Sequence, residues 1–451
     1  MTDKVLVIGA GAAGMQAALG MADAGIEVLL IDKSPIIGGA LAAQLNEDAV
    51  GEASREGDVL PRSSQIKNHE KIEILTLAEL TGLKGTEGHF SATISQKARF
   101  VNDNCIRCNN CRDVCPVVRP NEFDHGLSYR KAIYAPLHAS VPHPFVINID
   151  DCLNNPPNYM PCQRCTQACE DNAIYFNAPM EKQFIHEVTS VIVAVGAQST
   201  GIERLKELGF GSHPDILTDL ELDCFMSNTG PTGGFLEKPS TGNEPEGLVM
   251  AMTNQSRMAW HRAAHQVSWL VEEEISDITV LYTDTSAYGD DFESFWKETV
   301  GDGVKMIEGT VKEVTAKSDN SLEVVCSEAK SDKTLILPCE MVTLVTEQSP
   351  PHDLKRLAKR LDIDLAATGY INLPNGHSSK TTRAGVYAIG SAIGPMTTKH
   401  ALEAATSLAN DTGKAHVEEA TEQQIQAKID AGVQLRLANL INNIADMGKN
   451  G

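Results

Sequence analysis

Length, composition and charge describe a folded protein that does not bind polyanions. The chain has 451 residues, 42% hydrophobic and 22% charged, enough for two or three domains with sizeable cores. Its 60 acidic and 38 basic residues give a net charge of -22, which repels nucleic acid and anionic membrane surfaces. No apolar run is long enough to cross a membrane. We therefore expect a cytoplasmic protein with no nucleic-acid partner and no membrane insertion.

The chain opens with a pattern typical of a β-α-β unit. Residues 5–8 form a β-branched apolar run, residues 12–24 an alanine-rich helical pattern, and residues 27–31 a second strand. Gly9, Gly11 and Gly14 lie between the first strand and the helix, in the spacing of the dinucleotide fingerprint. In that fingerprint the first glycine makes a tight turn, the second lets backbone approach a pyrophosphate, and the third lets helix pack on strand.

An acidic residue completes the nucleotide pattern. Asp32 ends the second predicted strand, 23 residues after Gly9, where a carboxylate accepts hydrogen bonds from a ribose hydroxyl. The alternative, a glycine turn without a ligand, is disfavoured because strand, helix and acid all stand where the fingerprint needs them. This pattern leaves open whether the dinucleotide is FAD or NAD.

The rest of the chain predicts an α/β fold with two Rossmann-like domains, the first of them discontinuous. Strands at 72–75, 90–95 and 188–195 flank a cysteine-rich region that looks inserted, and strand 248–252, helix 257–274 and strand 277–282 form a second unit. The short strands 304–316, 321–326, 333–337 and 340–346 follow, then a core strand at 385–389 and a helix at 399–410. The predicted segments are 1–97, 179–228 and 346–415 for the flavin domain, 98–178 for an inserted ferredoxin-like domain, 229–345 for the second Rossmann-like domain, and 416–451 for a polar tail.

Three glycine-containing segments favour FAD at the first unit. Gly38-Gly39, Ala194-Val195-Gly196 and Ala388-Ile389-Gly390 resemble the signatures of the FAD-dependent pyridine nucleotide-disulfide oxidoreductase superfamily. Many of those proteins have an aspartate after the last glycine, where this chain has Ser391, so the contact there must differ. The residues that we expect to bind the cofactor are Gly9, Gly11, Ala13, Gly14, Asp32, Lys33, Gly38, Gly39, Ala194, Gly196, Gly390 and Ser391.

The second unit does not carry the same turn. Its first strand leads into Thr253-Asn254-Gln255-Ser256-Arg257-Met258, which contains no glycine where a pyrophosphate would need close backbone approach. NAD(P)H binding there is the alternative. We expect a retained fold without its ligand.

Eight of the eleven cysteines fall in two short runs that suit metal binding in a large intracellular enzyme. The first run, with a proline after it, has the C-x2-C-x2-C-x3-C-P spacing of bacterial ferredoxins, in which the fourth cysteine reaches the neighbouring cluster. The second run has a nine-residue first gap, 153–161, made of turn formers that can bulge as a loop. The predicted ligands are Cys105, Cys108, Cys111 and Cys169 for one [4Fe-4S] cluster, and Cys152, Cys162, Cys165 and Cys115 for the other. Zinc sites and a second site without Cys152 are the alternatives.

The segment between the two runs carries a family resemblance. Residues 121–152 (NEFDHGLSYRKAIYAPLHASVPHPFVINIDDC) resemble the A subunit of heterodisulfide reductases, and the likeness extends over most of residues 1–410. The resemblance implies FAD, several iron-sulfur clusters and electron transfer between a donor enzyme, the flavin and a catalytic partner. The chain departs from the family at 46–65 and 255–265, which lack cysteines, and at Met396, where bifurcating members often have a lysine, with Lys399 further on. These departures put additional clusters and bifurcation in doubt.

These observations support three hypotheses. In the first, the chain is an electron-transferring subunit in which FAD converts between paired electrons and the single electrons that clusters carry to partner subunits. In the second, it is a self-contained NAD(P)H-dependent reductase like the small subunit of glutamate synthase. In the third, the cofactors only stabilise an assembly. The first implies an oligomeric complex of redox subunits, with a ferredoxin, hydrogenase or dehydrogenase as donor, and oxygen sensitivity typical of anaerobic metabolism.

Overall fold

The computed structural model describes residues 4–40, 59–137, 140–155, 161–227, 230–329, 333–374 and 379–412. The predicted polar tail, most of the 46–65 segment and half of the loop at 153–161 lie outside these ranges. No helix among the described residues is long and apolar enough to cross a membrane.

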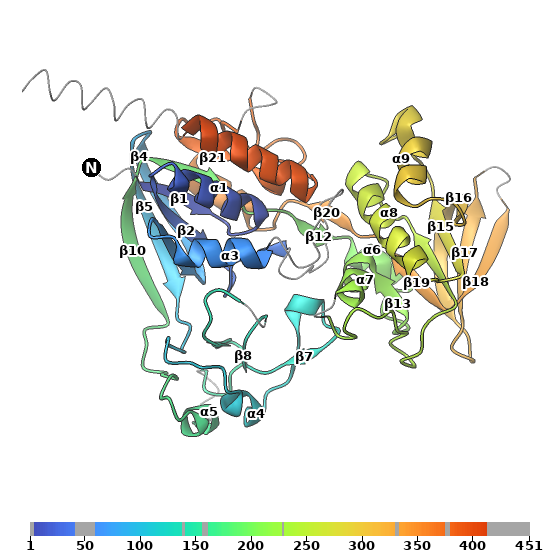
Figure 1. Cartoon of the computed structure of the whole chain (residues 1–451), viewed down its shortest axis with the longest axis horizontal. Helices are drawn as coiled ribbons and strands as arrows, with labels where there is room; N and C mark the ends of the chain where they lie inside the picture. Colours follow the sequence, from blue (N-terminus) through green and yellow to red (C-terminus); the bar gives the residue numbers. More distant parts are fainter. Residues whose placement is uncertain are drawn as a thin grey trace, which may run out of the picture.

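The first domain is built on a five-stranded parallel sheet in the order β21-β11-β1-β2-β3 (Figure 1). Strands β1, β2, β11 and β21 are short runs of apolar or β-branched residues that are mostly buried, as parallel strands usually are, whereas the edge strand β3 is only partly buried. Their bounds are Lys4–Ile8 (β1), Glu27–Asp32 (β2), Ile72–Thr76 (β3), Ser190–Val193 (β11) and Val386–Ala388 (β21).

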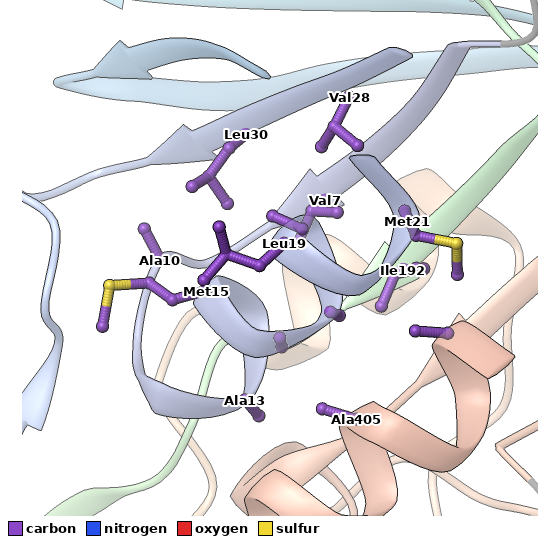
Figure 2. Close-up of a cluster of buried hydrophobic side chains, with 14 of the residues drawn as sticks. Val7, Ala10, Ala13, Met15, Leu19, Met21, Val28, Leu30, Ile192 and Ala405 are labelled. Atoms are coloured by element: carbon purple, nitrogen blue, oxygen red, sulfur yellow. The ribbon is translucent and has the colours of Figure 1, made fainter. Parts of the chain in front are cut away.

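Alternate residues of β1 face two different layers. Val5 and Val7 pack in a core cluster with helix α1 (Ala12–Asp23) and a C-terminal helix at residues 398–412. Figure 2 shows Val7 in this cluster, with Ala405 on the C-terminal helix. Helix α3 (Val59–Asn68) lies beside α1. Leu6 and Ile8 pack against a three-stranded antiparallel sheet and helix α10 (Leu354–Leu361). The bounds of that smaller sheet are Ala78–Thr86 (β4), His89–Lys97 (β5) and Glu181–Val188 (β10).

The second domain has a seven-stranded sheet in the order β13-β19-β14-β15-β16-β17-β18. Its strands are Ile216–Thr218 (β13), Gly247–Ala251 (β14), Asp277–Tyr282 (β15), Lys305–Ala316 (β16), Leu322–Glu328 (β17), Thr334–Cys339 (β18) and Met341–Leu344 (β19). Its helices are Ile202–Glu207 (α6), Asp219–Met226 (α7), Arg257–Glu272 (α8) and Phe292–Thr299 (α9), with 3-10 turns at Gly289–Asp291 (η2) and, in the first domain, Gly390–Ala392 (η3).

The boundary of this domain differs from the prediction. We assigned residues 179–228 to the flavin domain, but β13 pairs in parallel with β19 inside the seven-stranded sheet. Strand β19 lies between β13 and β14. The chain passes between the two domains through a pair of short antiparallel strands, Gln198–Thr200 (β12) and Glu347–Ser349 (β20). The prediction missed β13 because three buried residues are too few to show a period.

The cysteine-rich region leaves and rejoins the first domain between two neighbouring strands. It follows β5 and ends before β10, and these two strands pair along their whole length. Within it are helices Asn110–Asp113 (α4) and Arg164–Ala168 (α5), the 3-10 turn Glu122–Asp124 (η1), and the strand pairs Arg119–Pro120 (β6) with Tyr129–Arg130 (β7) and Ile133–Tyr134 (β8) with Val146–Ile147 (β9). Figure 1 shows α4 and α5 together at the lower edge of the view, away from β1 and β2.

Candidate functional site

The turn between β1 and α1 has the geometry of a dinucleotide-binding loop. Gly9 has φ +100°, which L side chains rarely adopt, and a Cβ there would lie 2.4 Å from the Ala194 carbonyl oxygen. A Cβ on Gly14 would lie 1.8 Å from the Gly9 carbonyl oxygen, so the third glycine allows the helix to meet the turn. Gly11 is the N-cap of α1, and no side chain caps the helix. The free N–H groups of the first turn therefore point to an anion site.

A cavity of about 340 Å³ opens beside this turn. Ten of the twelve residues that we expected to bind the cofactor line it: Gly9, Gly11, Ala13, Asp32, Lys33, Gly39, Ala194, Gly196, Gly390 and Ser391. Gly14 and Gly38 lie behind the wall, where the Gly38 N–H donates to the Ala10 carbonyl oxygen at 2.8 Å. The volume lies within the range of pockets that hold small molecules and cofactors.

Asp32 organises the turn as well as lining the cavity. One carboxylate oxygen accepts from the Ala10 N–H at 2.6 Å, and the other accepts from the Ser34 N–H at 2.7 Å. Burial raises the pKa of Asp32, while the two backbone hydrogen bonds and the charge of Lys33 act in the opposite direction. Each carboxylate oxygen can accept a second hydrogen bond, so Asp32 retains acceptor sites for a ligand hydroxyl.

The cavity wall opposite the turn between β1 and α1 includes residues in and beside helix α10, more than 300 positions after that turn. The sequence analysis did not identify these residues. Lys33 Nζ lies 3.0 Å from Asp353, and Arg356 and Arg360 of α10 each lie 3.0 Å from the Glu79 carboxylate on β4. All five side chains line the cavity. The strongly amphipathic pattern LKRLAKRL of α10 was the available signal, since its apolar face packs on the core and leaves its basic face beside the cavity.

The C-terminal side of the cavity includes Met396, which the sequence analysis singled out. Met396 lines the wall, together with Thr398 and Ala401 of the C-terminal helix. Lys399 is exposed and is not part of the lining. The side chain that this chain places at the cavity is thus an uncharged thioether.

The eight cysteines of the two runs gather around two separate small cavities. We define the first group as Cys105, Cys108, Cys111 and Cys169, which line one cavity. We define the second group as Cys115, Cys152, Cys162 and Cys165, which line the other. Each group takes three cysteines from one run and one from the other, which is the exchange expected from ferredoxin spacing. The apolar core of the region packs around both groups and includes Phe100, Val101, Ile133, Ile147 and Ile174.

Zinc is the alternative to clusters for these cysteines. Among the described residues, no group of three or more His, Cys, Asp or Glu side chains is placed to hold a single metal ion. A zinc site draws its ligands to about 2.0–2.3 Å from one centre, whereas a four-iron cluster gives each thiolate its own iron.

The cysteine thiols are held in an apolar setting. Burial, and then the charges of Cys105 and Cys165, raise the pKa of Cys111 to about 12. Burial similarly raises the pKa of Cys165 to about 11. A metal centre bound here would have to displace these thiol protons, which cations at thiol ligands do. Helices α4 and α5, which carry Cys111 and Cys165, contact each other, so the two groups are neighbours.

A loop joins the first group to the flavin-type domain. Arg107, between Cys105 and Cys108, donates to the carbonyl oxygens of Leu137, at 3.0 Å, and His143. In the same loop, the Val141 carbonyl oxygen accepts from the Ile37 N–H at 2.9 Å, one residue before Gly38. Val141 itself packs in the core beneath α1. The loop thus links Arg107, between two cysteines of the first group, to the backbone beside Gly38.

The corresponding turn of the second domain is filled by its own side chains. Ser256 caps α8 by accepting from the Ala259 N–H at 3.2 Å, and Asn254 accepts from the Ser256 N–H at 3.0 Å. Thr253 donates to the Val345 carbonyl oxygen. Tyr282, the last residue of β15, stands where Asp32 stands on β2 and packs edge-on against Trp260, with ring centroids 5.6 Å apart. These groups use the donors that a pyrophosphate would need.

Comparisons with known proteins agree with this arrangement. Residues 4–78 match the FAD dependent oxidoreductase family. The chain is 32% identical over 409 residues to the A subunit of the ferredoxin:CoB-CoM heterodisulfide reductase of Methanosarcina mazei, covering 87% of this chain and 50% of that protein. It is 30% identical to the A subunit of the H(2):CoB-CoM heterodisulfide,ferredoxin reductase of Methanothermobacter marburgensis, covering 90% and 63%. It is 31% identical to the iron-sulfur A subunit of the CoB--CoM heterodisulfide reductase of Methanocaldococcus jannaschii, covering 81% and 56%. The chain thus spans about half to two thirds of the length of these curated relatives.

Solved structures agree on the fold. Thioredoxin reductase of Lactococcus lactis aligns with a TM-score of 0.50 at 14% identity, covering 93% of this chain and all of that one. LpdA of Mycobacterium tuberculosis aligns with a TM-score of 0.50 at 16% identity, covering 91% and 72%. At such low identity the likeness concerns the fold alone. The chain is therefore similar, over most of its own length, to heterodisulfide reductase A subunits, and its fold is that of Rossmann-type FAD oxidoreductases.

Proposed function

We propose that this chain is the flavin- and cluster-bearing oxidoreductase subunit of a heterodisulfide-reductase-like complex. The observation that carries the proposal is the joint placement of one dinucleotide-type cavity and two four-cysteine groups, linked by the loop at 140–147. The names of the relatives, one of which is called an iron-sulfur protein, support it. A flavin exchanges electrons in pairs or singly, whereas each iron-sulfur cluster carries one at a time.

The residues of the cavity fit FAD. The uncapped N-terminus of α1 would hold the pyrophosphate, since its N–H groups and the helix dipole favour negative charge. Asp32 would accept from a ribose hydroxyl with its remaining lone pairs. Lys33, Arg356 and Arg360 would add positive potential along one wall, tempered by their partners Asp353 and Glu79. The apolar lining, which includes Ile8, Leu80 and Met396, would exclude water around the ring system.

The two cysteine groups fit two [4Fe-4S] clusters. Burial in an apolar core, as here, limits solvent access, and solvent access is one determinant of cluster potential. Arg107 brings a positive charge next to Cys105 and Cys108 while holding the loop at 140–147 in place. The chain would therefore relay electrons between the cavity and the second group through the first group.

The alternative of a self-contained NAD(P)H reductase is less well supported. The second domain offers no glycine turn, and Ser256, Asn254 and Tyr282 occupy the positions of phosphate and ribose recognition. Paired electrons would then reach the flavin from a partner subunit. The reaction on the final substrate would also take place in a partner, and a cytoplasmic location would suit such a complex.

Single cysteine-to-serine substitutions test the cluster proposal. In anaerobically purified protein we expect one FAD and about eight irons with matching sulfide, as two [4Fe-4S] clusters require. Cys115→Ser should then remove or alter the same paramagnetic signal as Cys162→Ser, although Cys115 belongs to the first run. Cys169→Ser should alter the same signal as Cys108→Ser. Cys326→Ser, a buried cysteine of the second domain, is the matched control and should leave the iron content unchanged. A content of about two irons, or of zinc, would contradict the proposal. So would signals that group Cys115→Ser with Cys108→Ser and Cys169→Ser with Cys162→Ser.

A further inference from the structure

We propose that Arg99 raises the reduction potential of the cluster that the first cysteine group would hold. The inference rests on the proposed function and adds to it the residue that determines how readily this cluster accepts an electron. Arg99 lies on the short stretch of chain between β5 and the first run of cysteines.

The Arg99 guanidinium lies between the cavity of the first domain and the cavity of the first group. It donates to the Pro35 carbonyl oxygen, and Pro35 follows Ser34, which lines the cavity of the first domain. It also donates to the Pro144 carbonyl oxygen at 3.0 Å, and Pro144 precedes Phe145, which lines the cavity of the first group. These hydrogen bonds fix a positive charge beside the first group.

No carboxylate forms an ion pair with Arg99 within the described part of the chain. Its third acceptor is the Thr76 hydroxyl at 3.2 Å, so the oxygens that it contacts are all neutral. The exposed Asp103 influences its charge without forming an ion pair. Burial lowers the pKa of Arg99 to about 10, which still leaves the guanidinium charged at neutral pH. Because a partly buried charge without an opposite charge beside it is costly, the position suits an anion bound nearby.

A second arginine lies in the same layer of the protein. Arg107, between Cys105 and Cys108, donates to the Leu137 carbonyl oxygen at 3.0 Å, and its charge lowers the pKa of Arg99. Two positive charges repel each other, so their joint placement costs free energy that a negative charge beside them would offset. Negative charge at Cys105 raises the pKa of both arginines. A cluster held by four thiolates would supply negative charge at this place.

The arginines at the second group are placed differently. Arg164, which lines the cavity of that group, is exposed to solvent. Arg130, two residues before Ala132 of the same lining, pairs with Glu122 and, at 3.0 Å, with Asp151. Solvent screening and paired carboxylates weaken the effect of these two charges on a neighbouring centre. A partly buried charge that neither solvent nor an ion pair offsets therefore lies at the first group.

This placement has a direct effect on the reduction potential. Reduction adds one electron, and therefore one negative charge, to a cluster, so a fixed positive charge stabilises the reduced form more than the oxidised form. Net charge and the groups around a cluster are among the determinants of its potential. The loss of one such charge commonly changes the equilibrium constant by about tenfold, which equals about 59 mV for a one-electron centre.

Redox titration of the anaerobic holoprotein tests the inference. The paramagnetic signal of each cluster is assigned with Cys108→Ser and Cys162→Ser and is then followed against potential in each variant. In Arg99→Gln, which removes the charge but keeps an amide donor, we expect the equilibrium constant for reduction of the first-group cluster to fall by about tenfold or more. Arg99→Lys, which keeps the charge without the planar fork, should stay within about threefold of wild type. The second-group cluster should change less than about threefold in both variants.

Two further substitutions separate charge from contacts. Arg383→Gln removes a matched guanidinium, which donates to the carbonyl oxygens of Leu361 at 2.7 Å and Gly85 at 2.9 Å, and it should leave both potentials unchanged. Thr76→Asp keeps Arg99 but places a carboxylate of similar volume against it. The new ion pair should lower the potential of the first-group cluster in the same direction as Arg99→Gln, whereas Thr76→Ser should not.

The remaining outcomes would overturn the inference. Equal losses in Arg99→Lys and Arg99→Gln would show that Arg99 acts through its contacts rather than its charge. Unchanged potentials in iron-loaded Arg99→Gln, or in Thr76→Asp, would exclude an effect of the charge while leaving the proposed function intact. If Arg99→Gln held no iron, Thr76→Asp would decide. A wild-type chain without iron would refute the proposed function itself, so the two failures are distinguishable.

Discussion

The two Rossmann-like units share a topology but end their strands differently. Strands β1 and β2 end at Gly9 and Asp32, beside an uncapped helix and a cavity. Strands β14 and β15 end at a polar, glycine-free turn and at Tyr282, beside a helix capped by Ser256. The comparison teaches that the fold alone does not bind a dinucleotide: the donors of the turn must remain free and the space beside them open.

The largest expected effect comes from closing the cavity at the first turn. A Cβ on Gly11 would meet nothing nearer than 3.8 Å, so Gly11→Leu should fold while its side chain enters the space reserved for the pyrophosphate. We expect FAD affinity to fall by about 100-fold or more, equivalent to about 2.7 kcal/mol. Flavin fluorescence titration of the apoprotein measures this. Ser256→Leu, at the equivalent cap of α8, should leave flavin affinity unchanged; equal losses would remove the distinction between the units.

Gly9→Ala should affect both fold and flavin. The substitution meets a φ of +100° and the Ala194 carbonyl oxygen at 2.4 Å, so backbone must move. We expect unfolding free energy to fall by about 1–3 kcal/mol together with flavin loss, measured by denaturant unfolding with and without FAD. A variant as stable as wild type would show that the turn is not constrained as described.

Asp32→Asn should weaken flavin binding less. The amide retains one acceptor oxygen but replaces the other with a donor, so one of the contacts to Ala10 and Ser34 is lost. We expect FAD affinity to fall by about tenfold, equivalent to one hydrogen bond to a charged group. Calorimetric titration gives the value. Asn254→Asp in the second turn should not confer measurable FAD binding.

The pH dependence of the apoprotein offers a related check. Burial raises the folded pKa of Asp32, so its contribution to stability is fully present below the unfolded value of 3.8 and is lost as pH rises through the folded pKa. Asp32→Asn removes that loss. As pH rises from 3.8, the stability of the variant relative to wild type should therefore increase and then level off. A constant difference over this range would contradict a raised pKa.

The smallest effect belongs to the second turn. Ser256→Ala removes the acceptor that caps α8 at 3.2 Å from the Ala259 N–H. We expect a loss of about 1 kcal/mol in unfolding free energy and no change in flavin content. Thermal unfolding with parallel flavin assays measures both. A fall in flavin content would mean that the second unit also takes part in cofactor binding.

Local patterns predicted the parts of the site that lie close in sequence. The spacing of Gly9, Gly11 and Gly14 predicted the turn, and ferredoxin spacing predicted the exchange of Cys115 and Cys169 between groups that the structure brings together. The far wall was only partly predictable in this way. The amphipathic pattern of α10 indicates a surface helix, but Arg356 and Arg360 reach the cavity because α10 packs on β4, a contact across about 280 positions that no local pattern indicates.

The boundary of the second domain was likewise not predictable from a local pattern. The absence of glycine at 253–258 correctly indicated a turn unlike the first. The place of β13 depended on its partner β19, more than 120 residues later, and three buried residues gave no pattern to identify it. The sequence was therefore most informative where chemistry demands a fixed local spacing, and least informative where strands distant in the sequence pair.

The central claim is that only the first Rossmann unit binds a dinucleotide, so electrons do not enter from NAD(P)H. The most direct measurement mixes the anaerobic holoprotein with NADH, NADPH or a low-potential one-electron donor and follows the flavin absorbance. The account predicts reduction by the one-electron donor and no bleaching on the same timescale by either nicotinamide. Rapid bleaching by NADH or NADPH would contradict it and make the chain a pyridine-nucleotide reductase.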